Sequence, residues 1–416
     1  MKDTDGNDLA AEGSWPDVCR ARTREPSLPT SCLSESRTAI VHDWCPAFRG
    51  GERVLARICS QFSNAEIFTL FDFLEADIKE SFFGDVKFNT SPLNRLPYSI
   101  KYYRSLFFLC PFLIEQFDVT GYDLVISSSA AFARGVITRP DQPHLCYVHS
   151  PMRYAWDEQF SYFKQGNIGF GPRGMLYRYL LHGLRTWDTR TAHGPDVMLA
   201  NSTYVRSRIR HVYGRDAVVV HPPVSTGEFE VVEEKDEYYV AASFLAPYKR
   251  TDLVIQAFNE MPSRRLVVVG EGQLSNSLRS QAGPNITFAG FLGRNEFKST
   301  IGRARAMVFA GCEDFGIALA EAQACGTPLV AFGRGGAADI VRPLGSFAAP
   351  TGVLFKQQTA SGVKDAVEWF EVNRDQITPR ACRENAERFS EQRFDAAIRK
   401  AVERTFSLHH VESRWF

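Results

Sequence analysis

The chain has 416 residues, more than one ordinary hydrophobic core encloses, so its length predicts two domains. Hydrophobic residues make up 44% and charged residues 23%, which are the proportions of a soluble globular protein. The 48 Lys and Arg balance the 48 Asp and Glu, and this argues against nucleic acid as a partner.

The first residues and the cysteines indicate where the protein works. Residues 1–36 are polar and interrupted by prolines, so we expect a disordered tail without a signal-peptide core. No apolar stretch approaches the roughly 20 residues that cross a bilayer. Nine scattered cysteines without a close C-x-x-C pair predict free thiols and a cytoplasmic location.

The first half of the chain alternates apolar runs with helix-like, charge-bearing segments. A strand is predicted at 37–43, followed by the Gly50-Gly51 turn and a helix, as in the opening of a Rossmann-like unit. Further strands are predicted at 65–70, 124–127, 144–149 and 197–200. The alternation predicts a parallel sheet covered by helices on both faces, in a first domain over residues 37–222.

The pattern breaks near residue 222, where the acidic stretch 228–237 predicts a surface linker. Strands are predicted again at 238–242, 266–270, 286–289, 306–309 and 328–331, in a second domain over 223–389. We expect a last helix within 390–416 to pack back on the first domain. The predicted fold class is α/β, with two Rossmann-like, doubly wound domains facing a central cleft.

Segment 311–330 carries the most chemical information, and we predict a strand end, a turn and a helix there. Gly316 allows the backbone to approach a ligand closely, and the amides of residues 316–318 at the helix N-terminus suit a diphosphate. Glu313 precedes the helix and Glu321 lies inside it, so one carboxylate can reach sugar hydroxyls and the other a ribose. Two solvated glutamates at a helix start are the alternative.

A second candidate loop follows the predicted strand 238–242, at the strand end where doubly wound sheets bind ligands. It carries Lys249 and Arg250. The compact ammonium of Lys249 suits the neutralisation of charge that develops on a leaving diphosphate. A surface Lys-Arg pair is the alternative.

A third polar segment follows the predicted strand 144–149. It holds His149, Arg153, Trp156 and Asp157. A structural histidine and a structural ion pair between Arg153 and Asp157 are the alternatives to a role in a binding site. The Gly50-Gly51 turn is a fourth and weaker candidate.

These segments together resemble glycosyltransferase family 4, over roughly residues 37–406. The most specific part is Glu313, seven intervening residues and Glu321, followed by Cys325-Gly-Thr-Pro328. The run from His149 to Asp157 looks like the bacterial mannosyltransferases of O-antigen and exopolysaccharide assembly. The resemblance implies the GT-B fold and a metal-independent transfer of a sugar, with retention, from a nucleotide donor.

The resemblance also implies roles for individual residues. It makes His149, Lys249 and Glu313 catalytic, and it makes Arg153, Trp156 and Asp157 acceptor contacts or structural residues. The residues implied in donor binding are Gly50, Gly51, Arg250, Asp314, Phe315, Gly316, Ile317, Ala318 and Glu321, with the Gly335-Gly336 turn as a further candidate. One departure is Phe244, which stands where the family usually has an arginine and leaves Lys249, with Arg250, to hold the phosphates.

The resemblance implies GDP-mannose as the donor and a lipid-linked oligosaccharide of surface polysaccharide assembly as the acceptor. Segment 95–114 mixes cations, tyrosines and a strongly apolar end, which predicts peripheral contact with the inner face of the membrane. A helix packed on the first sheet and broken at Pro111 is the alternative for this segment.

Three other functions compete with this prediction. A related enzyme would use a UDP- or dTDP-sugar, and a catalytically silent protein would bind a nucleotide sugar or a partner enzyme, as Phe244 favours. A nicotinamide oxidoreductase would need the strand-linked G-x-G-x-x-G spacing that the sequence lacks. The one Asp-x-Asp, Asp3-Thr-Asp5, falls in the predicted tail, so we expect no metal and no cofactor.

Overall fold

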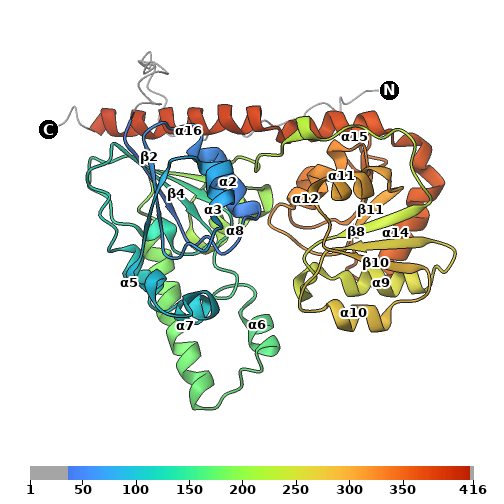
Figure 1. Cartoon of the computed structure of the whole chain (residues 1–416), viewed down its shortest axis with the longest axis horizontal. Coiled ribbons are helices and arrows are strands. Elements are labelled where there is room, and N and C mark those ends of the chain that lie inside the picture. Colours follow the sequence, from blue (N-terminus) through green and yellow to red (C-terminus); the bar gives the residue numbers. More distant parts are fainter. Residues whose placement is uncertain (1–35, 413–416) are drawn as a thin grey trace, which may run out of the picture. The chain divides into compact units, whose positions relative to one another are not determined.

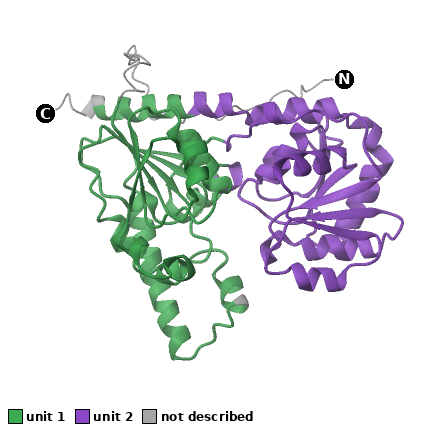
Figure 2. Cartoon of the chain, viewed as in Figure 1, with its two compact units in different colours: residues 1–201, 206–220, 398–416 green, residues 202–205, 221–397 purple. Residues whose placement is uncertain are grey.

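The computed structural model describes residues 36–412, so the predicted tail lies outside the described residues apart from Ser36. The chain divides into two compact units (Figure 2). Unit 1 comprises residues 1–201, 206–220 and 398–416, and unit 2 comprises residues 202–205 and 221–397.

The sheet of unit 1 is parallel and, within residues 36–412, has seven strands in the order β3-β2-β1-β4-β5-β6-β7 (Figure 1). They are β1 (Thr38–His42), β2 (Ala65–Thr69), β3 (Lys87–Thr90), β4 (Leu124–Ser129), β5 (His144–Val148), β6 (Val197–Ala200) and β7 (Val218–Val219). The strand order reverses between β1 and β4, where His42 pairs with Ser128. Such a switch point is where doubly wound sheets bind ligands.

Helices surround this sheet and close its core. They are α2 (Gly50–Cys59), α3 (Ala76–Phe83), α4 (Ser99–Tyr102), α5 (Cys110–Ile114), α6 (Gln159–Gln165), α7 (Pro172–Thr191) and α8 (Thr203–Tyr213). Segment 95–114 forms short elements instead of one helix, because Pro111 lies in the first turn of α5. In Figure 1, α6 and α7 project from the sheet-bearing part of unit 1, and we call residues 159–191 the arm.

The sheet of unit 2 is also parallel, and its strands within the described region follow the order β10-β9-β8-β11-β12-β13. They are β8 (Tyr238–Ala242), β9 (Arg265–Val269), β10 (Ile286–Gly290), β11 (Ala306–Phe309), β12 (Leu329–Phe332) and β13 (Gly352–Phe355). Here the order reverses between β8 and β11. The loops after these two strands therefore leave the sheet side by side.

Two hydrophobic clusters cover the two faces of the unit 2 sheet. The helices are α9 (Thr251–Asn259), α10 (Ser275–Gln281), α11 (Arg294–Arg303), α12 (Ile317–Ala324), α13 (Ala337–Ile340), α14 (Ala360–Asn373) and α15 (Pro379–Ala386). Side chains of α9, α10 and α14 fill one cluster, and those of α11, α12 and α13 fill the other. Helices on both faces of a parallel sheet in each unit confirm the predicted doubly wound α/β class.

The last helix, α16 (Glu391–Glu412), contributes to both units, since residues from Ile398 onward group with unit 1. Within unit 1, the His409 Nε2 atom lies 2.8 Å from the Asp196 carboxylate. The described stretch contains no helix that is long and apolar enough to span a bilayer. The cysteines in residues 36–412 carry free thiols.

Candidate functional site

Two loops at the switch point of unit 2 bring Lys249 and Glu313 together. Lys249 ends the 3₁₀ turn η5 (Pro247–Lys249) after β8, and Glu313 follows β11. The Lys249 ammonium forms an ion pair with the Glu313 carboxylate, and both side chains are largely buried, at 14% and 18% exposure. The loop geometry thus joins the two residues of this unit that the resemblance predicts to be catalytic.

Glycines permit the close approach of these loops. A Cβ atom on Gly311 would lie 2.8 Å from the Lys249 carbonyl oxygen, and one on Gly336 would lie 2.0 Å from that of Phe315. The Gly336 amide also donates a hydrogen bond to the Glu313 carbonyl at 2.8 Å. The predicted Gly335-Gly336 turn therefore packs directly on the glutamate loop.

Helix α12 begins beside this pair. Its N-cap Gly316 has φ +95°, a conformation that favours glycine, and the first amides of a helix lack an acceptor within the helix. This N-terminus can therefore hold an anion. Phe315 is buried against the rings of His221 and Phe389, at centroid distances of 5.5 and 5.4 Å, so its side chain supports the loop from inside.

Glu321 points to a partner that the sequence did not predict. Its buried carboxylate accepts a hydrogen bond from Arg294 at 2.8 Å, and Arg294 also pairs with Glu228 at 3.3 Å. Burial alone would lower the pKa of Arg294. The charges of Glu321 and Glu228, with their hydrogen bonds, together outweigh burial, so the pKa of Arg294 lies above its ordinary value. Arg294 fixes the Glu321 carboxylate from the first turn of α11.

The neighbours of Lys249 are arranged less simply. Arg250 pairs with the Asp252 carboxylate at 3.1 Å. It is the N-cap residue of helix α9 and has a left-handed backbone conformation with φ +52°. Phe244 is 46% exposed in the loop after β8. Lys249 is therefore the cation of this loop that lies against Glu313.

In unit 1, His149 follows β5 and belongs to a chain of polar side chains. Its Nε2 atom lies 2.8 Å from the Ser128 hydroxyl, which lies 3.1 Å from Nδ1 of His42. Asn201 donates a hydrogen bond to the His149 carbonyl at 2.9 Å. The structure thus connects the ends of β1, β4 and β5 through His42, Ser128 and His149.

The surroundings of these histidines keep His149 neutral. Burial, together with the charge of His42, lowers the pKa of His149 from 6.5 to about 3. The Gly50-Gly51 turn opens α2 nearby, since a Cβ atom on Gly51 would lie 4.0 Å from the His42 ring. Burial also raises the pKa of Glu52 in the same turn. The sequence singled out His149 and the glycines but missed His42 and Ser128.

Asp43 ties the end of β1 to the loop after β4. Its buried carboxylate accepts hydrogen bonds from the amides of residues 130, 131, 132 and 133, at 2.6, 2.9, 2.5 and 2.6 Å. A carboxylate in such a nest of amides is strongly stabilised. Asp43 thereby fixes the loop next to Ser128.

Arg153 and Asp157 do not form the ion pair that was the alternative to a role in the site. Arg153 lies 3.4 Å from Glu158, and Asp157 lies 2.5 Å from Arg208, because Arg208 of α8 already holds this loop through the Ser150 hydroxyl at 2.6 Å. Trp156 donates a hydrogen bond to Asp188 at 2.7 Å. All three side chains are engaged within unit 1.

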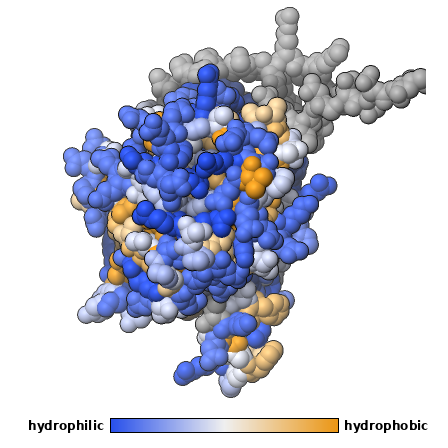
Figure 3. Space-filling model, turned by 90° about the vertical axis from the view of Figure 1, so that its right-hand side faces the viewer, coloured by the Kyte–Doolittle hydropathy of each residue, from blue (hydrophilic) through white to orange (hydrophobic). Residues whose placement is uncertain are grey.

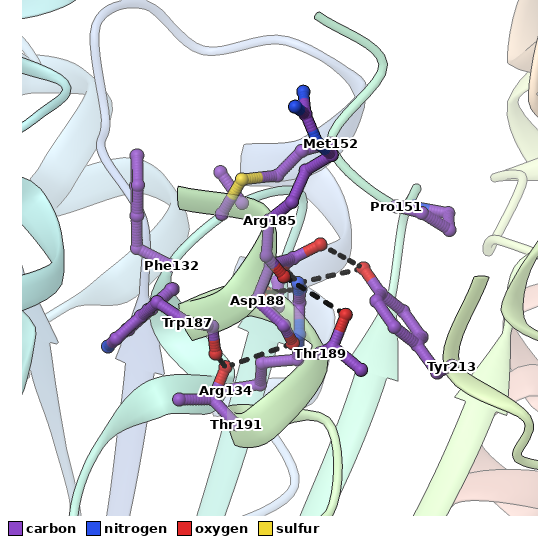
Figure 4. A network of polar contacts seen from close by, with 12 residues as sticks. Phe132, Arg134, Pro151, Met152, Arg185, Trp187, Asp188, Thr189, Thr191 and Tyr213 are labelled. Atoms are coloured by element: carbon purple, nitrogen blue, oxygen red, sulfur yellow. Dashed lines mark hydrogen bonds and ion pairs between the residues drawn. The ribbon is translucent and has the colours of Figure 1, made fainter. Parts of the chain in front are cut away.

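A buried network supports the segment after His149 from below (Figure 4). Arg134 forms an ion pair with Asp188, and both side chains are fully buried. The Tyr213 hydroxyl points between them, donating to Asp188 at 3.0 Å and accepting from Arg134 at 2.8 Å. Because breaking a buried pair leaves an uncompensated charge, this network holds α7, α8 and the Trp156 loop in one arrangement.

Both halves of the chain match models of glycosyltransferase families. Residues 48–228 match the family model of Glycosyltransferase Family 4, and residues 227–389 match that of Glycosyl transferases group 1. The chain belongs to these glycosyltransferases. The predicted family is confirmed, whereas the closer likeness to O-antigen and exopolysaccharide enzymes stays a prediction.

Curated relatives are similar over part of their length. A GDP-mannose-dependent monoacylated alpha-(1-6)-phosphatidylinositol monomannoside mannosyltransferase of Corynebacterium glutamicum is 29% identical over 179 residues, covering 36% of this chain and 47% of the relative. A GDP-mannose-dependent alpha-(1-6)-phosphatidylinositol monomannoside mannosyltransferase of Mycobacterium tuberculosis is 29% identical over 219 residues, covering 45% and 55%. This glycosyltransferase spans about half the length of these relatives.

A solved structure agrees on the fold. Anabaena HepE in complex with UDP matches with a TM-score of 0.63 at 15% identity, covering 87% of this chain and 98% of HepE. At this identity the likeness shows the fold alone. The predicted GT-B class is confirmed.

Proposed function

We propose that this glycosyltransferase moves a mannosyl group from GDP-mannose to a hydroxyl of a lipid-linked acceptor, with retention at the anomeric carbon. The observation that carries the proposal is the meeting of Lys249 and Glu313 at the switch point of unit 2, beside the N-terminus of α12. The two GDP-mannose-dependent relatives support the choice of donor.

In this reaction the bond between the anomeric carbon and the diphosphate oxygen breaks. The acceptor oxygen forms the new bond, and its proton passes to a phosphate oxygen of the departing GDP. Negative charge grows on the departing GDP, and the Lys249 ammonium and the first amides of α12 stabilise it. Glu313 holds hydroxyls of the donor sugar, and Glu321 holds the ribose. His149, kept neutral, contacts the donor sugar as a hydrogen-bonding group and takes no proton.

The remaining donor residues act through the backbone. Gly50 and Gly51 allow the first turn of α2 to approach the donor phosphates, and residues 314–318 shape the anion site at α12. The names of both relatives give a phosphatidylinositol monomannoside as their acceptor, which supports a lipid-linked acceptor here. A lipid-linked oligosaccharide of surface polysaccharide assembly is likewise a sugar attached to a lipid.

One other donor class has an observation in its favour. HepE has been crystallised with UDP and with UDP-glucose, so a UDP-sugar is the second candidate.

The test is release of the nucleoside diphosphate by the full chain from GDP-mannose, UDP-glucose, UDP-N-acetylglucosamine and dTDP-rhamnose. We expect GDP-mannose to react fastest, with a chelator leaving the rate unchanged. Faster turnover of a UDP-sugar would replace the donor. Binding of GDP-mannose without release of GDP, with or without magnesium, would make this protein a silent binder.

A further inference from the structure

Unit 1 exposes large apolar side chains in two segments that are distant in sequence. One segment is 95–114 and the other is the arm. Their exposed side chains are Leu96, Tyr98, Ile100, Tyr102, Phe108 and Phe112 in the first, and Phe160, Tyr162, Phe170, Met175, Leu176 and Tyr179 in the second. Single exposed apolar residues are normal on proteins, but such a collection in one unit calls for a partner.

Ring contacts pack the two segments against each other. Phe107 contacts Tyr177 of α7 at a centroid distance of 5.4 Å, and Tyr177 contacts Phe163 of α6 at 5.9 Å. Phe107 and Phe163 belong to the hydrophobic core of unit 1, against which Tyr177 packs. The exposed side chains are therefore presented from a packed base, and we call them the aromatic surface.

Helix α7 presents three exposed apolar side chains on one face. Met175, Leu176 and Tyr179 are 52%, 59% and 73% exposed, and their spacing places them together on the first turns of the helix. In Figure 3 the arm shows at the bottom of the view, where hydrophobic and strongly hydrophilic side chains lie next to each other. This mixture is typical of a surface that enters the boundary between lipid tails and headgroups.

Basic residues predominate around the aromatic surface. Residues 95–114 and the arm contain eight Lys and Arg and one acidic residue, the fully buried Asp188, although acidic and basic residues balance over the whole chain. The flanking carboxylates of Glu115, Asp157 and Glu158 pair with arginines. The Arg178 guanidinium lies between the rings of Phe163 and Phe170, at 4.1 and 4.3 Å from their centroids. The side chains of Lys101, Lys164 and Arg173 are exposed.

We propose that the aromatic surface docks unit 1 on a bilayer that contains anionic lipids. Aromatic and aliphatic side chains bury their area at the headgroup level, and each nearby cation is attracted by the negative surface. This deepens the proposed function, because it rests on a lipid-linked acceptor that the enzyme meets at the membrane. An acidic protein partner is the competing occupant.

The experiment is co-sedimentation of the full chain with vesicles of phosphatidylcholine alone and of phosphatidylcholine mixed with phosphatidylglycerol. We expect binding at least about tenfold tighter to the vesicles with phosphatidylglycerol. The double variant Leu176→Glu/Tyr179→Glu should lose at least about tenfold of that affinity, because two apolar contacts become charges of the same sign as the lipid.

The control is Val372→Glu, which places one such negative charge on an 80% exposed position of α14 in unit 2 and should bind like wild type. All variants should keep the wild-type circular dichroism and the wild-type rate of GDP release without lipid. Equal binding to both vesicle types, or binding by the double variant that matches Val372→Glu, would overturn the docking and favour a protein partner. A wild-type protein that binds the vesicles but releases no GDP from GDP-mannose would refute the proposed function and leave the docking proposal standing.

Discussion

The Lys249 ammonium and the Glu313 carboxylate form an ion pair within unit 2, although one follows β8 and the other β11. The two side chains hold each other in position while they are largely buried. A diphosphate at the N-terminus of α12 would compete with Glu313 for the ammonium, and Glu313 would then be released toward the sugar. The pair is thus suited to exchange partners when a donor binds.

Glu321 should contribute to binding of the nucleotide more than to the chemical step. A ribose hydroxyl keeps its hydrogen bond in the ground and transition states, so Glu321→Gln should weaken GDP binding by about ten- to a hundredfold and leave kcat nearly unchanged. Calorimetric titration with GDP measures this directly.

The control for that variant is Glu228→Gln, which removes the second carboxylate on Arg294 and should leave GDP affinity unchanged. If Glu321→Gln lowers stability but binds GDP as tightly as wild type, Glu321 only pairs with Arg294. A double-mutant cycle with Arg294→Gln should give a coupling of about 1 kcal/mol in the free energy of unfolding.

Ser128 should position His149 for the reaction. Ser128→Ala removes the hydroxyl 2.8 Å from His149 Nε2, and we expect kcat to fall by roughly tenfold with the donor KM nearly unchanged. Ser127→Ala is the matched control, since this neighbouring buried serine lies 2.8 Å from His144 instead. A similar kcat for both variants would show that the hydroxyl of Ser128 is only structural.

Asp43 should be among the most important residues for the stability of unit 1. In the wild type the Asp43 carboxylate accepts hydrogen bonds from four backbone amides, and Asp43→Asn replaces one of its oxygens with a donor NH2 group. The free energy of unfolding should therefore fall by about 3 kcal/mol or more. Asp123→Asn, an exposed carboxylate that accepts from the Arg37 amide at 2.9 Å, should cost less than about 1 kcal/mol. Denaturant unfolding of both variants decides this, and equal costs would contradict the role of Asp43.

The buried His144 should make stability depend on pH. Burial lowers its pKa from 6.5 to about 4, so between these values the unfolded chain takes up a proton that the native chain does not. The free energy of unfolding should therefore fall by about 3 kcal/mol as the pH drops from 6.5 to 4. His144→Asn should flatten that part of the profile, whereas the exposed His182→Asn should not, and an unchanged slope in His144→Asn would refute the assignment.

The sequence predicted the inner strands of the two sheets and the edge strand β10, and it missed the three other edge strands. Strands β1, β2, β4, β5, β6 and β8 to β12 coincide with apolar runs, which burial on both faces requires. The missed strands are β3, β7 and β13. β7 has two residues, and β3 carries partly exposed polar side chains at the end of its sheet, so neither shows the apolar run of a buried strand.

The site was predictable where a local motif carried it. Glu313 and Glu321 stand within one segment, and Lys249 follows a recognisable strand. The partners Arg294, Ser128 and Asp43 were missed because their contacts join elements that are distant in sequence and meet only in the folded units. The same reason explains Asp157, a loop residue whose partner Arg208 lies on helix α8.

The most direct test of the account is the kcat for GDP release from GDP-mannose by Lys249→Ala, with saturating donor and a vesicle-bound lipid acceptor. The ammonium stabilises charge that grows as the glycosidic bond breaks, so kcat should fall by about ten- to a hundredfold. Lys364→Ala, which breaks the exposed pair with Glu260 at 3.3 Å, should match wild type. A kcat for folded Lys249→Ala equal to that of wild type would contradict the assignment of Lys249 and Glu313 as the reaction centre of unit 2.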